Sequence, residues 1–86
     1  MSYFVYILEC ADGTLYVGST NNLGKRLYEH NNLKSGAHYT KIRRPVVLKY
    51  SEEVPDFATA RAREAEFKRW SREEKLNFIN TQENSK

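Results

Sequence analysis

Five side chains in this sequence are of types that carry chemistry, and they come from three stretches of the chain. Tyr6 and Tyr16 lie ten residues apart, in two separate β-rich runs. Arg26 and His30 are four residues apart, a spacing that places both on neighbouring parts of one helix face. Glu64 lies within the run ARAREAEFKRW. Phenol and imidazole groups transfer protons, and a carboxylate binds cations, so the set is compatible with acid–base chemistry beside a cation.

Glu64 is informative because of its position around a helix. At about 100° per residue, Glu64 falls between Phe57 and Phe67, close to the apolar side of the helix. A carboxylate on an apolar arc is expected to be partly buried, and a buried charge needs a partner or a metal ion. The simpler alternative is a salt bridge within one helical turn, to Arg61 or Lys68.

The other four residues have ordinary structural explanations as well. Aromatic residues such as Tyr6 and Tyr16 are common in strands, where they pack a sheet. An arginine on a helix face is usually solvated, and a single histidine such as His30 is more often a packed neighbour than a catalyst. None of these residues is specific by itself, so the functional interpretation depends on the elements that would bring them together.

A hairpin and a third strand are the first of these elements. Tyr3–Glu9 and Thr14–Gly18 are β-rich runs, and the connection between them carries an Asp-Gly pair, which is a strong hairpin signal. The first run is apolar on both faces, so we expect it to be a central strand that is covered on each side. Val46–Ser51 contains β-branched and aromatic residues and predicts the third strand.

Three helices are expected from capping and periodicity. The first begins after Asn21 or Asn22 and runs to about Asn32, the second is Phe57–Trp70, and the last extends from about Arg72 to Asn80. The fold class is therefore α+β: a small three-stranded, mainly antiparallel sheet flanked by helices, in the order β-β-α-β-α-α. Residues 1–80 are expected to form a single domain, and residues 81–86 a frayed C-terminal tail.

Composition restricts the class of protein further. With 86 residues, the chain is long enough for one domain with a small core. A single cysteine excludes an internal disulfide and a cysteine-based zinc site. The sequence has no signal peptide and no apolar run near the roughly 18 residues that a membrane span needs. We therefore expect a cytoplasmic protein without a membrane partner.

The positive charge is concentrated in the middle of the chain. The net charge is only +3, but residues 25–44 contain six basic residues and one acidic residue, Glu29. Such a concentration favours a polyanionic partner over a surface that is merely solvated. Besides Arg26, the basic residues of this segment are Lys25, Lys34, Lys41, Arg43 and Arg44.

Taken together, these residues resemble the signature of the GIY-YIG nuclease superfamily. Val5-Tyr6-Ile7 and Tyr16-Val17-Gly18 match the paired motif that gives the superfamily its name. The other matching residues follow in the family's order: Arg26, His30, Thr40 and Glu64. The resemblance covers residues 3 to about 79. It is closest to the small stand-alone bacterial members, which are similar to the catalytic domain of Slx-type structure-specific nucleases.

The resemblance implies a role for each of the five residues. A single divalent cation, Mg²⁺ or Mn²⁺, would be held by Glu64, and Arg26 would bind a non-bridging phosphate oxygen. Tyr16 is the favoured general base for the attacking water, and Tyr6 would orient that water or share its proton. His30 would relay the proton or act as the base itself.

The substrate that the resemblance implies is DNA, and branched, flap and single-stranded forms are candidates, in repair or recombination. Backbone contacts are expected from Lys25, Lys34, Lys41, Arg43 and Arg44. Such contacts carry no base information and weaken with salt. Because no sequence-reading element is recognised, specificity is expected to come from DNA shape or from a protein partner.

Two other functions are compatible with the same residues. One is a non-catalytic nucleic-acid-binding module that keeps the fold and its basic surface, although a pure binder has no need for a buried carboxylate. The other is a nuclease subunit that is active only with a partner protein. DNA cleavage by the isolated chain, and its loss on replacement of Glu64, would separate these functions from a self-sufficient endonuclease.

Overall fold

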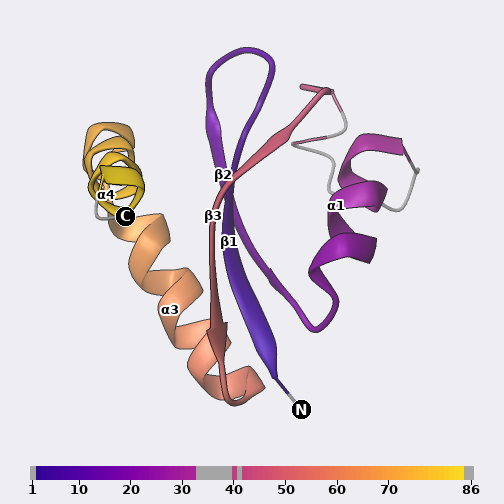
Figure 1. Ribbon diagram of the computed structural model, residues 1–86, viewed down its shortest axis with the longest axis vertical. Helices are drawn as coiled ribbons and strands as arrows, with labels where there is room; N and C mark the ends of the chain where they lie inside the picture. The colour runs from indigo at the N-terminus through magenta and orange to yellow at the C-terminus, as the bar shows by residue number, and fades with distance from the viewer. Residues whose placement is uncertain (1, 33–39, 41, 85–86) are drawn as a thin grey trace.

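The chain folds as a small sheet with helices on both faces (Figure 1). The structure is a computed structural model, and it describes residues 2–32, 40 and 42–84. In chain order, its elements are β1 (Tyr3–Glu9), β2 (Leu15–Thr20), α1 (Leu23–Asn32), β3 (Val47–Val54), α3 (Phe57–Arg69) and α4 (Arg72–Asn84). For this part of the chain, the α+β fold class and the order β-β-α-β-α-α are confirmed.

The central strand of the sheet is β1, which pairs antiparallel with β2 on one side and with β3 on the other. The four residues from Val5 to Leu8 are all buried, which confirms that both faces of this strand are covered. Strand β3 continues to Val54, beyond its predicted end at Ser51. The reason is its register, because Val54 pairs with Tyr3 and β3 thereby follows β1 to its start.

Alternation along the strands divides the core into two layers. One layer lies between the sheet and helices α3 and α4, and its buried members are Val5, Ile7, Val17, Val54, Ala60, Phe67 and Ile79. The other lies between the sheet and α1, and its buried members are Tyr6, Leu8, Cys10 and Val46. Figure 1 shows α1 on one side of the sheet and α3 and α4 on the other.

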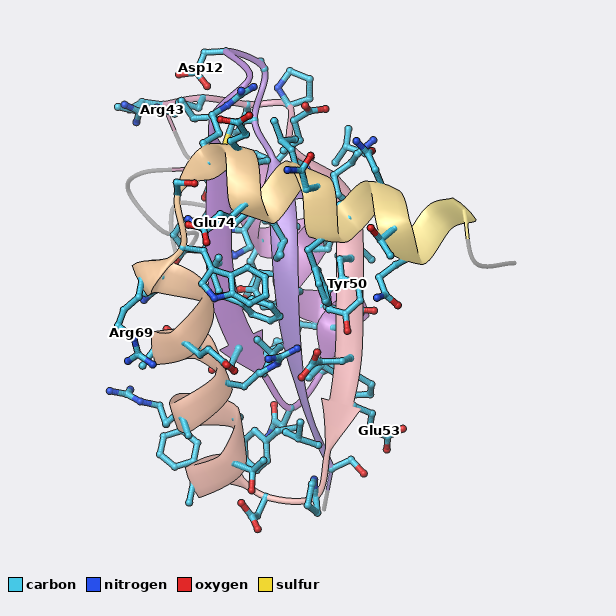
Figure 2. The ribbon with its side chains drawn as sticks, turned by 90° about the vertical axis from the view of Figure 1, so that its left-hand side faces the viewer. Asp12, Arg43, Tyr50, Glu53, Arg69 and Glu74 are labelled. Atoms are coloured by element: carbon cyan, nitrogen blue, oxygen red, sulfur yellow. The ribbon has the colours of Figure 1, made fainter. Side chains whose placement is uncertain are left out.

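The hairpin between β1 and β2 is fixed at its tip by local and distant contacts. Gly13 has φ of +85°, a conformation that side chains rarely adopt, and the Asp12 carboxylate accepts the Thr14 backbone N–H at 3.1 Å. Arg43 forms an ion pair with Asp12 at 3.0 Å, and the two lie together at this end of the molecule in Figure 2. Arg72 of α4 donates to the Gly13 carbonyl at 2.9 Å.

Capping sets the boundary between α3 and α4. Asp56 accepts the backbone N–H of Thr59 at 2.7 Å at the start of α3. Ser71 and Glu74 form the predicted capping box at the start of α4, with reciprocal bonds of 2.8 and 3.1 Å. Trp70, predicted as the last residue of α3, is its C-cap.

Helix α4 extends further than the sequence predicted. It continues to Asn84, whereas an end near Asn80 was expected. No Gly or Pro interrupts residues 80–84, and the Thr81 hydroxyl donates to the Asn77 carbonyl at 2.9 Å, so the helical path continues. In Figure 2, Tyr50 of β3 lies beneath α4. Its ring packs edge-on against Phe78, with centroids 4.9 Å apart, and anchors the helix to the sheet.

Candidate active site

The hairpin places both tyrosines on the face of the sheet that α1 covers. Tyr6 of β1 pairs with Gly18 of β2, and Tyr16 precedes Gly18 by two residues, so these three residues face the same side. On α1, the ring of His30 contacts both phenol rings, with centroid distances of 5.8 Å to Tyr6 and 5.2 Å to Tyr16. The structure thus brings together three of the predicted site residues.

Gly18 is needed to make room for the side chain of Tyr6, and not to form a turn. A Cβ atom at this position would lie 2.5 Å from the Tyr6 hydroxyl oxygen and 2.7 Å from the ring carbon that carries it. Tyr6 has no free space to move into, because its side chain is 2% exposed and its hydroxyl is bonded to His30. The glycine of the second motif therefore gives Tyr6 room to lie across β2.

His30 is buried at the centre of this group. Its Nε2 lies 2.8 Å from the Tyr6 hydroxyl, and its Nδ1 lies 2.6 Å from the Thr40 hydroxyl. Burial, together with the nearby charge of Arg26, lowers the pKa of His30 to about 4. The imidazole is therefore neutral at pH 7, with one ring nitrogen that donates and one that accepts.

Burial distinguishes the two tyrosines from each other. Burial and the charge of Tyr16 raise the pKa of Tyr6 to about 12, so Tyr6 is a protonated phenol at neutral pH. Tyr16 is only half-buried, whereas Tyr6 and His30 are fully enclosed. Of these three side chains, Tyr16 is the one that reaches solvent.

Arg26 extends the group towards the surface of α1. Its guanidinium hydrogen-bonds the hydroxyl of Tyr6 and forms an ion pair with Glu29 at 3.1 Å. Burial disfavours the charge, but the bonds to Glu29 and Tyr6 outweigh that effect and raise the pKa of Arg26 above its usual value. The side chain keeps 27% of its surface exposed, so the cation stays within reach of an anionic ligand.

Glu64 approaches from the other face of the sheet, beside the edge strand β2. The Ser19 hydroxyl donates to Glu64 Oε1 at 2.7 Å, and the Lys68 ammonium contacts Oε2 at 2.7 Å. Burial raises the pKa of Glu64, but the bonds from Lys68 and Ser19 more than offset it and leave the pKa below its usual range. The carboxylate is therefore ionised at neutral pH, and its charge contributes to the raised pKa of Tyr6.

The donor set at Glu64 fits a hydrated divalent cation. Among the residues that the structure describes, no three His, Cys, Asp or Glu side chains gather around a common point. Mg²⁺ usually keeps several waters and is bound by one or two carboxylates together with phosphate oxygens. Glu64 is a carboxylate of this kind, and its Oε2 is paired with the ammonium of Lys68 in the structure. The salt bridge to Lys68 that the sequence suggested is thus present as well.

Two of the arginines predicted to contact nucleic acid have protein partners. Arg43 pairs with Asp12 at the hairpin tip. Arg44 donates to the backbone carbonyls of His30 and Glu29, the latter at 3.0 Å, and so caps the last turn of α1. Both side chains are therefore engaged in holding elements together.

The predicted lysine contacts differ in how far the structure describes them. Lys25 is exposed on the first turn of α1, on the same helix as Arg26. Lys34 and Lys41 lie outside the described residues.

Three side chains at the site were not among the predicted site residues: Ser19, Thr40 and Lys68. Lys68 had a sequence signal, because it lies four residues after Glu64. Ser19 follows Gly18, so strand alternation places it on the α3 side, but only the packing of α3 brings it to Glu64. Thr40 matches the family order, yet no periodicity connects it to His30.

The chain is similar to known proteins of one family. Residues 2–77 match the family model described as the GIY-YIG catalytic domain. A UPF0213 protein of Syntrophus aciditrophicus is 55% identical over 76 residues, which cover 88% of this chain and 87% of that protein. A UPF0213 protein of Desulfotalea psychrophila is 45% identical over 82 residues, covering 95% and 74% respectively.

Two solved structures have the same fold. The solution NMR structure of a UPF0213 protein from Bacillus halodurans has a TM-score of 0.60 and 36% identity, and covers 94% of this chain and 85% of that one. The solution NMR structure of a protein from E. faecalis has a TM-score of 0.66 and 36% identity, and covers 96% and 88%.

The fold and the site are those of a small α+β domain with a paired-tyrosine hairpin and a helix glutamate. The chain belongs to the GIY-YIG family, and its relatives are small proteins built around this one domain. Membership implies nuclease activity on DNA, and nucleases of this family generally use divalent metal ions. None of the helices within residues 2–32 and 42–84 has the length and apolar character that a bilayer crossing demands.

Proposed function

We propose that this protein is a metal-dependent endonuclease that hydrolyses phosphodiester bonds of DNA with structural features such as flaps or branches, in repair or recombination. The observation that carries the proposal is the ionised carboxylate of Glu64, held by Ser19 at the edge of the strand that also bears Tyr16. A single domain thus offers a cation ligand, a phosphate-binding guanidinium and two phenols. DNA shape or a protein partner would supply specificity.

Glu64 would hold the metal ion, Mg²⁺ or Mn²⁺. When bound, such an ion polarises the scissile phosphate and stabilises the charge on the leaving 3′ oxygen. Ser19 donates to one carboxylate oxygen and thereby fixes the orientation of the other, which faces Lys68. The salt bridge to Lys68 is weak enough to be exchanged, because helix pairs of this spacing contribute only about 0.3–0.5 kcal/mol.

Arg26 would bind a non-bridging oxygen of the scissile phosphate. A planar guanidinium gives directed, charge-assisted hydrogen bonds to phosphate, and the partial exposure of Arg26 leaves room for one. The hydrogen bond to Tyr6 and the ion pair with Glu29 restrict its orientation before DNA arrives.

Tyr16 would accept the proton of the attacking water as a phenolate, after its own hydroxyl proton has been lost to solvent. Its partial exposure supports this role, because the buried His30 and Tyr6 have little access to water. Tyr6 remains protonated, with a pKa raised to about 12, and would act through its bonds to His30 and Arg26 rather than by contact with the water. Tyr16→Phe should therefore reduce the rate of DNA cleavage by about 100-fold or more, and Tyr6→Phe by less. Equal rates for Tyr16→Phe and the wild type would transfer the role of base to Tyr6 and His30.

Cleavage of labelled linear, flap and branched DNA, with Mg²⁺, Mn²⁺ or EDTA, tests the proposal. We compare the wild type with Glu64→Gln, which keeps the shape of the side chain but not its charge. Glu66→Gln is the matched control, because Glu66 lies on the same helix and pairs with Arg63. Metal-dependent cutting that falls by at least about 100-fold in Glu64→Gln, and persists in Glu66→Gln, is expected.

A non-catalytic DNA-binding module is the second candidate, and one observation favours it. Both carboxylate oxygens of Glu64 already have protein partners, as a purely structural carboxylate would. In that case the wild type and Glu64→Gln would bind DNA equally and neither would cut. Cutting that appears only when another protein is added would instead identify a subunit that depends on a partner.

A further inference from the structure

A chain of four hydrogen-bonded side chains runs through the layer between α1 and the sheet. The Arg26 guanidinium bonds the Tyr6 hydroxyl, which lies 2.8 Å from His30 Nε2, and His30 Nδ1 lies 2.6 Å from the Thr40 hydroxyl. His30 and Thr40 are completely buried, and Tyr6 is 2% exposed. The chain thus links a partly exposed cation to a threonine in the interior.

The direction of the hydrogen bonds follows from the donors available. A guanidinium only donates, so the Tyr6 oxygen accepts from Arg26 and its single proton is free to go to His30. If His30 carried its proton on Nε2, both Arg26 and His30 would donate to the Tyr6 oxygen. The Tyr6 proton would then have no acceptor on His30. The neutral imidazole therefore carries its proton on Nδ1, where Thr40 accepts it. Within the described residues, this arrangement agrees with the finding that no buried side-chain polar atom lacks a partner.

We propose that Thr40 is a positioning residue of this active site: its hydroxyl accepts the Nδ1–H proton of His30 and so stabilises the tautomer that the bonds at Tyr6 favour. In this tautomer, His30 accepts the Tyr6 proton, and the Tyr6 oxygen is turned towards Arg26. Thr40 thereby aligns the guanidinium with a phosphate, although it touches neither DNA nor the reacting atoms. This role in cleavage rests on the nuclease function proposed above, whereas the tautomer itself does not.

The position of Thr40 in the fold supports this role. The Arg43 backbone N–H donates to the Thr40 carbonyl at 3.0 Å, and Arg43 is in turn paired with Asp12. The backbone carbonyl of His30 accepts from Arg44. The backbone carbonyls of His30 and Thr40 therefore both accept hydrogen bonds from arginines, which fixes the hydroxyl and the imidazole relative to each other.

Long-range ¹⁵N–¹H NMR of the imidazole in the full chain, without metal or DNA, tests the tautomer. The second histidine of the sequence is replaced by His38→Gln, so that a single imidazole is observed. At pH 7 we expect the Nδ1–H pattern in this background, the same pattern with Thr40→Ser, and its loss with Thr40→Val. An Nε2–H pattern in the background protein, or an unchanged Nδ1–H pattern in Thr40→Val, would overturn the proposal. If Thr40→Val does not fold, the background protein and Thr40→Ser still decide.

DNA cleavage measures the consequence of the tautomer. Thr40→Val should lower kcat on the order of 10-fold, and Thr40→Ser should restore it to within about 2-fold of the wild type, since outer-shell hydrogen bonds of this kind typically contribute 10- to 100-fold. A lost tautomer with an unchanged kcat would overturn the positioning role. If the wild type cuts no DNA, the nuclease proposal fails, and the NMR result still decides the part that Thr40 plays.

Discussion

Tyr6 is the residue on which the other site residues converge. It crosses β2 over Gly18, bonds to His30 and accepts a hydrogen bond from Arg26. Each of these contacts is buried or partly buried, so a small change at one of them is expected to be felt by the others. Gly18 and His30 give the clearest tests of this interdependence.

Gly18→Ala should destabilise the protein and displace Tyr6. The new Cβ would lie 2.5 Å from the Tyr6 hydroxyl, and overpacking of this kind costs about 1–3 kcal/mol in the free energy of unfolding. Gly24→Ala is the control, because the nearest atom to its Cβ would be 4.0 Å away and alanine favours the helix by up to about 1 kcal/mol. Urea denaturation compares the two variants. Equal stability of Gly18→Ala and the wild type would show that Tyr6 has room to move.

His30 should make the protein less stable as the pH falls from about 6.5 to about 4. Its pKa is about 4 in the folded protein and near 6.5 when unfolded, so the unfolded chain binds the proton first. The contribution is complete above pH 6.5 and is lost as the pH falls towards 4, by about 3 kcal/mol at most. Urea denaturation at pH 7, 6 and 5 measures it. His30→Asn should be less stable throughout and nearly flat over this interval. A wild type that is equally flat would contradict a buried neutral imidazole.

At the scale of elements, the two arginines before β3 connect this part of the chain to the hairpin and to α1. Arg43 reaches the hairpin tip, and Arg44 caps the carbonyl end of α1. From the sequence, both arginines were candidates for DNA contact, as members of a charged run. The structure gives them partners within the fold, so their first effect is expected on stability.

Arg44→Gln should therefore lower the stability of the protein. The variant leaves the Glu29 and His30 carbonyls with a weaker partner, and hydrogen bonds that involve a charged group contribute about 1.5–3 kcal/mol. Arg69→Gln, an exposed change on α3, is the control and should stay within about 0.5 kcal/mol of the wild type. Thermal and urea unfolding measure both. If Arg44→Gln were as stable as the wild type but bound DNA more weakly, Arg44 would contact DNA, as the sequence predicted.

At the scale of the whole molecule, the two helical layers have different roles. Helix α1 carries Arg26, His30 and the exposed Lys25, whereas α3 carries Glu64 and, with α4, covers the larger apolar face. The edge strand β2 is where groups from both layers meet. With a net charge of only +3, DNA binding should depend on where the charges lie rather than on their sum.

Lys25→Gln and Lys75→Gln separate local charge from net charge, because they remove the same charge from α1 and from α4. Lys25→Gln should weaken DNA binding and reduce the slope of log K against log salt by about 1, as the loss of one phosphate contact does. Lys75→Gln should leave the slope nearly unchanged. Fluorescence anisotropy with labelled DNA over a range of salt concentrations measures both. Equal slopes for the two variants would indicate attraction by net charge alone.

The amino-acid sequence by itself determined where the helices and strands lie and which of their side chains face the core. Turn chemistry at Asp12-Gly13, alternation along β1 and capping at Asp56 and Ser71 act over a few residues, so they can be read without the fold. The same local rules placed Tyr6 and Tyr16 on one hairpin. They also set Glu64 beside the apolar side of α3.

Only the tertiary structure decided which of these groups touch one another and in which state. Ser19 and Glu64 are 45 residues apart, His30 and Thr40 are 10 apart, and Arg44 and His30 are 14 apart, and no periodicity relates either member of these pairs to the other. Their contacts depend on how the two helical layers pack on the sheet. The neutral state of His30 and the protonated state of Tyr6 likewise result from burial, which exists only after the chain has folded.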